Sequence, residues 1–204
     1  MTKPLMRGTP LQYTRTMLSD DSNGADEEDE GPLSSTTLVR VLDVLDRRPA
    51  GHEIQALAEP SFHLVRSRVV NADEIEQGSE INMDSGIIGP ISEIRFKDLS
   101  QASQGELTDS ILKAISSDPD KHLMFYNSAG PMSLKFHAFQ LLAGVGNSKA
   151  MQMVKSRGGN GWSTFEQVDE SCGIESARLL AERYVKEMED TAQTPSLLDI
   201  LVRS

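Results

Sequence analysis

Residues 141–154 read LLAGVGNSKAMQMV, a Gly-Val-Gly turn between two apolar helical segments. Gly144 and Gly146 carry no Cβ and can adopt positive φ, so the chain can reverse tightly and bring its amides close to a bound group. The segment from Asn147 begins a new helix, whose first N–H groups lack partners within the helix and carry the positive end of its dipole. A phosphate oxygen is a natural ligand at such a helix start. The stretch therefore predicts a phosphate-binding turn.

The same residues resemble the helix-hairpin-helix motif, which binds DNA and RNA without reading sequence. The usual pattern is Leu-Pro-Gly-Ile-Gly, three variable residues and Ala, and this chain has LAGVG at 142–146 followed by Ala150, so the proline is replaced. We expect the turn and the start of the following helix to contact the nucleic-acid backbone through Gly144, Val145, Gly146, Asn147, Ser148 and Lys149. The alternative is an ordinary connection between helices with a glycine at a C-cap.

Charge placement favours an anionic partner at this turn. The chain as a whole is acidic, with 20 Lys and Arg against 31 Asp and Glu, which weakens non-specific attraction to phosphates. Between Asp120 and Glu166, however, the sequence has no acidic residue. We expect three cations of this window, Lys135, Lys155 and Arg157, to add phosphate contacts. For Lys155 and Arg157 the alternative is that residues 155–162 only join two hairpins.

The segment after this connector repeats the architecture in degenerate form. Ser163 is the expected N-cap of a helix, with Glu166 completing a capping box. The turn CGIESA (172–177) then leads into a helix with one apolar face. Where the first turn has Gly146, the second has Glu175, whose carboxylate would repel a phosphate. We therefore expect the second hairpin to be structural.

The N-terminal half has strand and turn signals instead. Short runs rich in Val, Ile and Leu occur at 36–45, 61–70, 79–83 and 91–96, separated by Pro, Gly, Asn and Asp. They predict a small β-barrel over residues 35–98, and a barrel beside hairpins suggests an OB-fold. An SH3-like barrel or a curled sheet would give the same pattern. Its candidate binding face comprises Arg40, Phe62, Arg66, Arg68 and Arg95, although solvated strand positions explain the arginines equally well.

Three further segments complete the expected organisation. Residues 99–130 form a helical bridge, in which Leu107, Ile111, Leu112 and Ile115 make one apolar stripe and Pro119 restarts a helix. The paired-hairpin domain covers residues 131–190, and a C-terminal extension covers 191–204. Residues 1–34 lack apolar periodicity and contain DEEDE at 26–30, so we expect a disordered acidic tail.

Taken together, the chain from residue 38 to the C-terminus resembles the archaeal domain of unknown function 655 family. The most specific pieces are FYNSAGP at 125–131 and the hairpin, with His137 and residues 141–146 in matching order. The resemblance implies an α+β fold in which an OB-like barrel precedes an all-α paired helix-hairpin-helix domain. It also implies RNA binding and a link to ribosome assembly or translation, with ribosome-associated proteins as further partners.

Catalytic and metal-binding patterns are missing from the sequence. The four histidines, His52, His63, His122 and His137, have no metal-ligand spacing with one another or with Cys172, and no paired carboxylates follow a catalytic pattern. We expect no enzyme, no cofactor and no metal. A nuclease is the alternative, because acidic residues of distant loops could gather a magnesium ion.

The sequence thus favours a non-catalytic nucleic-acid binder, of RNA rather than DNA, that contacts phosphates through the Gly-Val-Gly turn. The alternative is a protein-interaction adaptor in which the hairpins are structural and PSLLDILVRS (195–204) docks a partner through Leu197, Leu198, Ile200 and Leu201. A single cysteine fits a reducing interior. Without a membrane span or a leader, we expect a cytoplasmic protein; the oligomeric state stays open.

Overall fold

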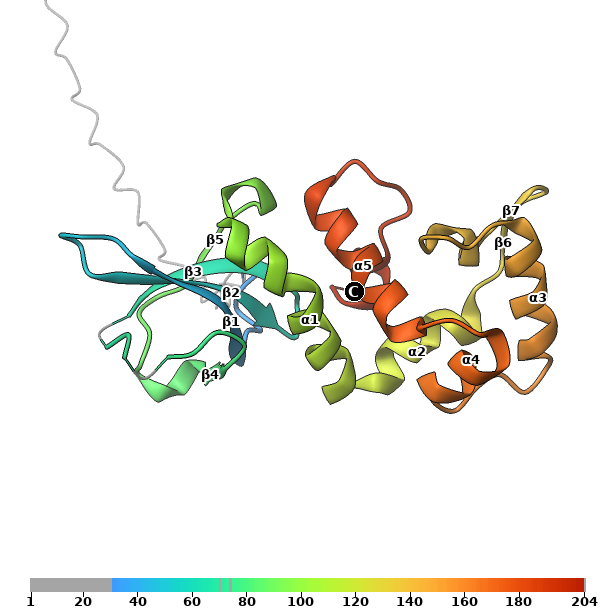
Figure 1. The fold of residues 1–204 in the computed structure, drawn as a ribbon, viewed down its shortest axis with the longest axis horizontal. Coiled ribbons are helices and arrows are strands. Elements are labelled where there is room, and N and C mark those ends of the chain that lie inside the picture. Colours follow the sequence, from blue (N-terminus) through green and yellow to red (C-terminus); the bar gives the residue numbers. More distant parts are fainter. Residues whose placement is uncertain (1–30, 70, 74, 204) are drawn as a thin grey trace, which may run out of the picture. The chain divides into compact units, whose positions relative to one another are not determined.

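The computed structural model describes residues 31–69, 71–73 and 75–203. The expected acidic tail lies outside the described residues except for its last four positions. Residues 31–204 form one compact unit, in which a β-sheet comes first and helices follow (Figure 1).

The sheet is antiparallel and has the strand order β4-β1-β2-β3-β5. Its described strands are β1 (Leu38–Asp46), β2 (His52–Glu59), β3 (His63–Val69), β4 (Glu80–Asn82) and β5 (Ser92–Glu93). The predicted α+β class is confirmed. The sheet is open, because no pairing within the described residues joins β4 to β5. These two end strands have only three and two residues, too few to form the ladder that would close a barrel.

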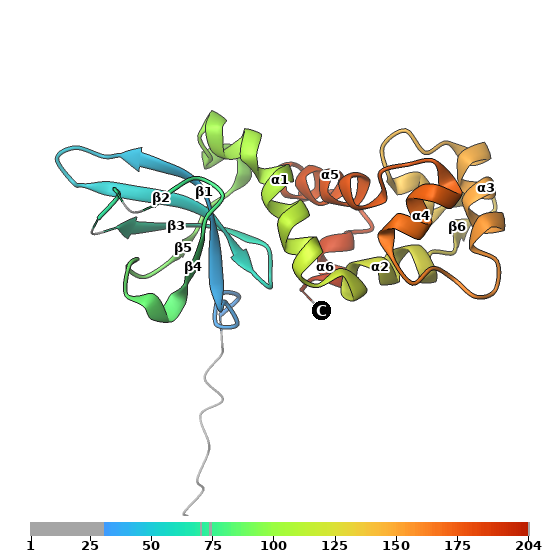
Figure 2. The same ribbon diagram turned by 60° about the horizontal axis from the view of Figure 1, so that its bottom comes forward.

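Each face of the sheet contributes to a hydrophobic core, although Arg66 and Arg68 of β3 are exposed. One face packs Val39, Ile54 and Val65 into a small core with loop residues such as Ile75 and Ile88. The other face contributes Leu42 and Leu57 to a larger core that continues into the helices. Figure 2 shows α1 lying between the sheet and α5, and both contacts are present in the structure.

The helical half begins with η2 and ends near the C-terminus. Its elements are η2 (Phe96–Asp98), α1 (Gln101–Ser117), α2 (Pro119–Ser128), β6 (Pro131–Ser133), β7 (Phe136–His137), η3 (Ala138–Leu141), α3 (Asn147–Arg157), α4 (Phe165–Cys172), α5 (Ser176–Glu189) and α6 (Leu197–Leu201); a further short helix, η1 (Met83–Ser85), follows β4. The restart at Pro119 is confirmed. The segment before the glycine turn is a 3-10 helix of four residues preceded by the β6–β7 hairpin, which the sequence did not predict.

The start of α4 corrects the expected cap. Thr164, not Ser163, is the N-cap, and its hydroxyl accepts a hydrogen bond from Gln167 N. Gln167 in turn accepts one from Ser163 N through Oε1. Gln167 rather than Glu166 thus takes part in the cap, and its side chain binds the residue before the N-cap.

The predicted stripe on α1 is buried. Leu107, Ile111 and Ile115 are inaccessible to solvent, whereas Leu112 is half-buried. The start of the helix is tied to the sheet, because Gln55 Oε1 accepts from Ser100 N at 2.8 Å and from the Ser103 hydroxyl at 2.7 Å. A helix fixed at its cap and along one face holds the sheet and the helices as one body.

A cluster of three rings adds to this contact. His122 of α2 stacks on Phe62, with ring centroids 5.6 Å apart, and its Nδ1 lies 3.0 Å from the hydroxyl of Tyr184 in α5. Phe62 is almost fully buried, so the prediction that it belongs to a binding face is wrong. Burial, assisted by the charge of Lys121, lowers the pKa of His122 to about 4.

We expect Ile111→Ala to lower the free energy of unfolding by about 2–5 kcal/mol, because it deletes buried side-chain volume in the shared core. Urea unfolding followed by Trp162 fluorescence and by far-UV circular dichroism measures this loss. The two probes should give one midpoint in each protein. Leu112→Ala, on the half-buried flank of the same helix, is the control and should cost clearly less.

Stability should fall as the pH falls from about 6.5 toward 4. Since the pKa of His122 is about 4 in the folded protein, the unfolded chain binds this proton in that window while the native protein does not, which favours unfolding. The loss from this residue should approach roughly 2 kcal/mol by about pH 5. Urea unfolding of wild type and His122→Asn at several pH values tests it: an unchanged pH dependence in the variant would contradict the assignment.

Candidate nucleic-acid interface

The glycine turn, residues 142–146, uses its two glycines differently. Gly144 adopts positive φ of 74°, as the sequence predicted, and Gly146 is extended with φ −81°. Val145 is buried, and its N–H donates to Leu142 O at 3.2 Å. The buried valine anchors the turn, while both glycines lie at the surface.

The start of α3 faces solvent and is capped by no side chain of the described residues, because Gly146 is its N-cap. The first hydrogen bond of the helix runs from Ala150 N to Gly146 O. Asn147 and Ser148, the first two residues of the helix, are exposed. The amides at a helix start lack partners within the helix and carry partial positive charge, so this terminus suits an anionic oxygen.

The second turn, residues 173–175, leads into a helix start that is already occupied. Asp169 Oδ1 accepts hydrogen bonds from Ser176 N, at 2.7 Å, and from the Ser176 hydroxyl. Ser176 is fully buried, and its carbonyl accepts from the Tyr126 hydroxyl at 2.7 Å. An internal carboxylate thus takes the place at α5 that a phosphate would take at α3, as a structural second copy requires.

The predicted cations divide into two groups. Lys135 and Lys155 are exposed. Lys149 donates to Cys172 O at the end of α4. Arg157 donates through Nη1 to Tyr126 O at 3.1 Å and Ala129 O at 2.6 Å, and it lies over the Phe139 ring. Lys149 and Arg157 therefore stabilise the C-terminal ends of α4 and α2, and neither is directed to a phosphate site in this structure.

A cation that the sequence analysis missed lies beside the glycine turn. Lys186 of α5 is exposed and lines a shallow groove with residues 140–146, together with Glu182 and Arg183. Lys186 is about 40 residues from the turn and outside the acid-free window, so no local pattern connects the two. Its i−4 neighbour Glu182 offsets part of its charge.

The candidate face on the sheet is smaller than predicted. Arg40 is buried and pairs with Glu59 at 2.9 Å and with Glu80 at 2.8 Å, so both its candidacy for a binding face and the alternative of a solvated position are wrong. Burial raises the pKa of Glu59, and the Arg40 charge opposes that shift. Arg66 and Arg68 are exposed on β3.

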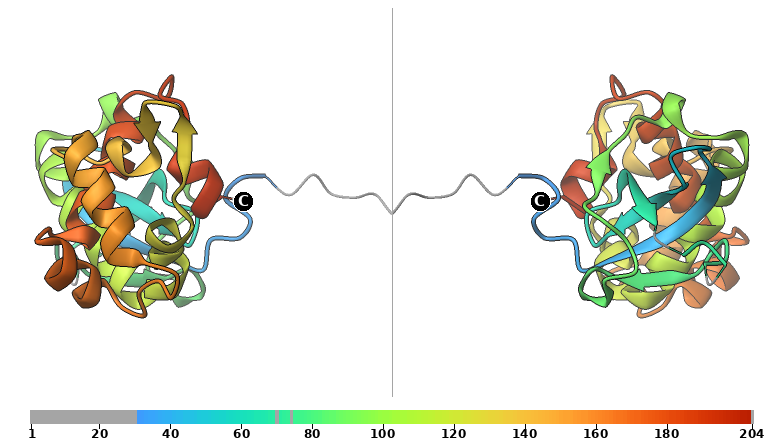
Figure 3. Two further views of the ribbon diagram at one scale, coloured as in Figure 1. Left: turned by 90° about the vertical axis from the view of Figure 1, so that its right-hand side faces the viewer. Right: turned by 90° about the vertical axis from the view of Figure 1, so that its left-hand side faces the viewer.

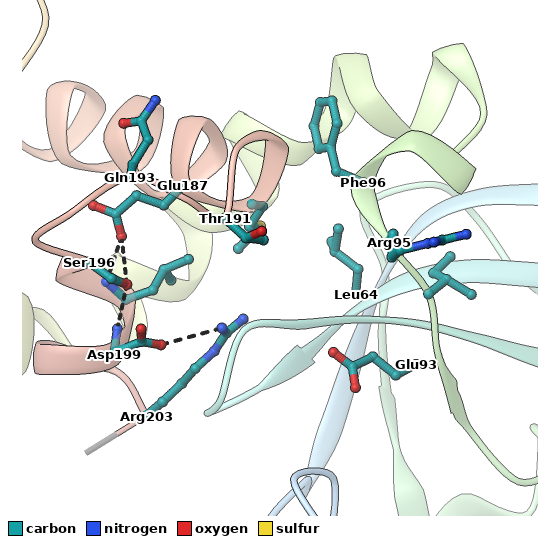
Figure 4. A pocket seen from close by; sticks show the side chains of 13 residues that line it. Leu64, Glu93, Arg95, Phe96, Glu187, Thr191, Gln193, Ser196, Asp199 and Arg203 are labelled. Atoms are coloured by element: carbon teal, nitrogen blue, oxygen red, sulfur yellow. Dashed lines mark hydrogen bonds and ion pairs between the residues drawn. The ribbon is translucent and has the colours of Figure 1, made fainter.

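The C-terminal segment is part of the core. Leu197, Leu198 and Leu201 are buried, and of the four predicted docking residues Ile200 is exposed. Glu187 accepts from Leu197 N at 3.0 Å and Leu198 N at 2.9 Å, and it forms a buried ion pair with Arg183 at 2.6 Å. Figure 4 shows Glu187 beside Ser196, and Arg203 directed to Asp199. The segment stabilises its own chain, so the docking role predicted for the three buried leucines is wrong.

The described residues contain neither a candidate metal site nor a candidate membrane-spanning helix. No three His, Cys, Asp or Glu side chains there gather as a metal site, and no helix there is long and apolar enough to cross a membrane. His137 is buried and caps η3, since its Nδ1 accepts from Phe139 N at 3.2 Å. Burial, with the nearby charge of Arg157, lowers the pKa of His137.

The protein is α+β, with an open antiparallel sheet followed by a helical half in which two turns, residues 142–146 and 173–175, lead into α3 and α5. Residues 45–196 match the family described as "Protein of unknown function (DUF655)", and the chain belongs to this family. It is 23% identical over 158 residues to the uncharacterized protein MJ0038 of Methanocaldococcus jannaschii, covering 72% of this chain and 73% of that protein. The crystal structure of Af1531 from Archaeoglobus fulgidus, a DUF655 structure, is similar with a TM-score of 0.70 at 21% identity, over 79% of this chain and 98% of that one.

The two helix starts should respond oppositely to changes at their caps. Asp169→Ala should lower the free energy of unfolding by about 1–2 kcal/mol, because α5 loses its cap and a buried serine loses its partner. Gly146→Asp should be neutral or stabilising by a few tenths of a kcal/mol, because Asp is a better N-cap than Gly. No atom of the described residues beyond the local chain lies within 4 Å of a Cβ at position 146. Thermal and urea unfolding measure both changes.

Proposed function

We propose that this protein is a non-catalytic RNA-binding protein that contacts backbone phosphates through the glycine turn and the first turn of α3. The observation that carries the proposal is the solvent-facing start of α3, where Gly146 leaves the helix amides without a side-chain cap from the described residues. The comparable helix start at α5 is closed by Asp169. This contrast supports the start of α3, rather than that of α5, as the site for an external anion.

Local charge supports the same site. Residues 121–165 contain no acidic side chain, although the chain carries a net charge of −11. Lys135, Lys155 and Lys186 are exposed cations of the helical half, and Lys186 lines the groove at the turn. Backbone contacts of this kind give affinity without reading sequence.

The finer parts of the proposal rest on the family resemblance and on the residue patterns. RNA as the preferred nucleic acid, a cytoplasmic location and a role in ribosome assembly or translation, with ribosome-associated proteins as partners, follow from the resemblance and the sequence. The absence of catalysis is proposed because no catalytic or metal-ligand pattern occurs in the sequence. Loss of an RNA-cleaving activity on chelation of divalent ions would establish the nuclease alternative instead.

Wild type should bind labelled RNA, and Gly146→Asp should remove most of the binding, because the new carboxylate both caps α3 and repels phosphate. Fluorescence anisotropy with duplex RNA, single-stranded RNA and duplex DNA measures it. With about three cations at the interface, affinity should fall by roughly 20- to 40-fold between about 50 and about 200 mM salt.

Gly146→Ala is the matched control. It adds a side chain at the same open position without a charge, and it should retain most of the binding if the amides make the contact. Wild-type affinity in Gly146→Asp, with the fold intact by circular dichroism, would refute the assignment of the glycine turn.

A further inference from the structure

The β6–β7 hairpin presents apolar side chains to solvent at the end of the protein that carries α3. Leu134 is fully exposed, and Met132 and Phe136 are 45% and 37% exposed. Ser133 pairs with Phe136 across the hairpin, which leaves Leu134 and Lys135 as the two residues of its turn. Figure 3 (left) shows this end of the molecule toward the viewer, with the hairpin above α3.

The fold of this chain does not account for these side chains. Two-residue turns favour Gly, Asn, Asp and Ser, and a leucine in contact with water contributes no core packing. Single exposed apolar residues are ordinary. Three within five positions on one projecting hairpin form a small apolar tip, which we define as Met132, Leu134 and Phe136.

The base of the hairpin is held firmly, so the tip is presented in a fixed position. Ala138 N donates to Gly130 O at 2.9 Å, which joins the two ends of the hairpin. Arg157 of α3 donates to Ala129 O at 2.6 Å, directly before it. Phe139, two residues after β7, is buried and packs against the rings of Phe125 and Tyr126. The same α3 thus fixes the hairpin and carries the proposed phosphate site at its start.

The positive charge of the hairpin favours a nucleic acid as the partner of the apolar tip. Lys135 is exposed between Leu134 and Phe136, and the hairpin lies inside the acid-free stretch 121–165. A lysine at the centre of an apolar protein interface must lose its hydration, and such positions are depleted in lysine. Between nucleotides the same lysine can pair with a phosphate while its apolar neighbours meet bases.

We propose that the apolar tip of the β6–β7 hairpin is a wedge that enters RNA where bases are unstacked, at a bulge or a junction, next to phosphates held by the glycine turn. This inference rests on the proposed function and adds the structural class of RNA. Apolar side chains of other nucleic-acid-binding proteins enter base steps in this way, at an unstacking cost of a few kcal/mol. The cost is least where the bases are already unpaired, so the wedge selects interrupted helices.

The test compares two RNA duplexes that differ by a single-nucleotide bulge flanked by 2-aminopurine. Wild type should bind the bulged RNA about ten-fold more tightly than the uninterrupted duplex, and its binding should change the 2-aminopurine fluorescence. Leu134→Ser should lose this preference and most of the fluorescence change while keeping its affinity for the uninterrupted duplex. Ile200→Ser, an exposed apolar position of α6, is the matched control and should behave as wild type.

Each other outcome refutes at least one of the two proposals. If Leu134→Ser retains the preference, the tip faces a different partner, such as a protein, and the wedge is refuted. If this variant loses affinity equally for both RNAs, the tip makes backbone contacts and the wedge is again refuted. If Gly146→Asp binds as wild type while Leu134→Ser loses the preference, the glycine turn is refuted and the wedge stands. If wild type binds neither RNA, both proposals fall.

Discussion

The structure depends on the burial of α1 between the sheet and α5. Leu107, Ile111 and Ile115 of this helix belong to a core that includes Leu57 on the sheet and Leu180 on α5. Because one set of side chains fills both contacts, loss of α1 would open the core that the sheet shares with the helical half, whereas the small core on the other face of the sheet contains, among the described residues, none of α1. The polar contacts at the start of the helix fix its orientation on the sheet, since Gln55 of β2 accepts hydrogen bonds from both Ser100 and Ser103. The helices that carry the glycine turn are thereby built on a fixed support, which is the condition for a site made of backbone amides.

The ends of the helices show how the chain distributes its charged side chains. Arg157 stabilises the end of α2, Lys149 the end of α4, and Glu187 the start of α6. Asp169 does the same at the start of α5. Each of these contacts gives orphan backbone groups a partner of the favourable sign. The start of α3 has no such partner among the described side chains, and it is the start that follows the Gly-Val-Gly turn. The start of α2 also has no side-chain cap from the described residues, so the contrast with the capped starts of α4, α5 and α6 supports α3 as a candidate for an external anion only together with the glycine motif.

Local patterns predicted the local parts of this structure. Periodicity located α1, and the glycine spacing located the turn and the helix after it. Strand β2 was not among the quoted runs, because HEIQALAE is rich in residues with low β-propensity; its position between β1 and β3 imposes the extended conformation.

The role of Arg157 could not be read from the sequence, since its carbonyl partners lie about 30 residues earlier. The same holds for PSLLDILVRS, whose leucines look available for docking until α5 and Glu187 are placed beside them. Side chains with the same local sequence pattern can be exposed for binding or used within the fold, and long-range packing determines which of the two occurs.

The acidity of the chain constrains what kind of binding is physically reasonable. A net charge of −11 repels a polyanion at long range, so electrostatic steering cannot be the main source of affinity. The contacts left to such a protein are short-range ones: amide donors at a helix start, a few exposed lysines, and apolar surface that meets bases. Amide donors and apolar surface act on contact and are screened little by salt, whereas phosphate pairing by many lysines is lost steeply. The proposed contacts would select RNA by shape, because the RNA would have to reach the turn of α3 and the β6–β7 tip together. Among the described residues, few exposed lysines lie in the part of the protein that carries the turn, which fits the proposed recognition of a particular RNA structure rather than general attraction to nucleic acid.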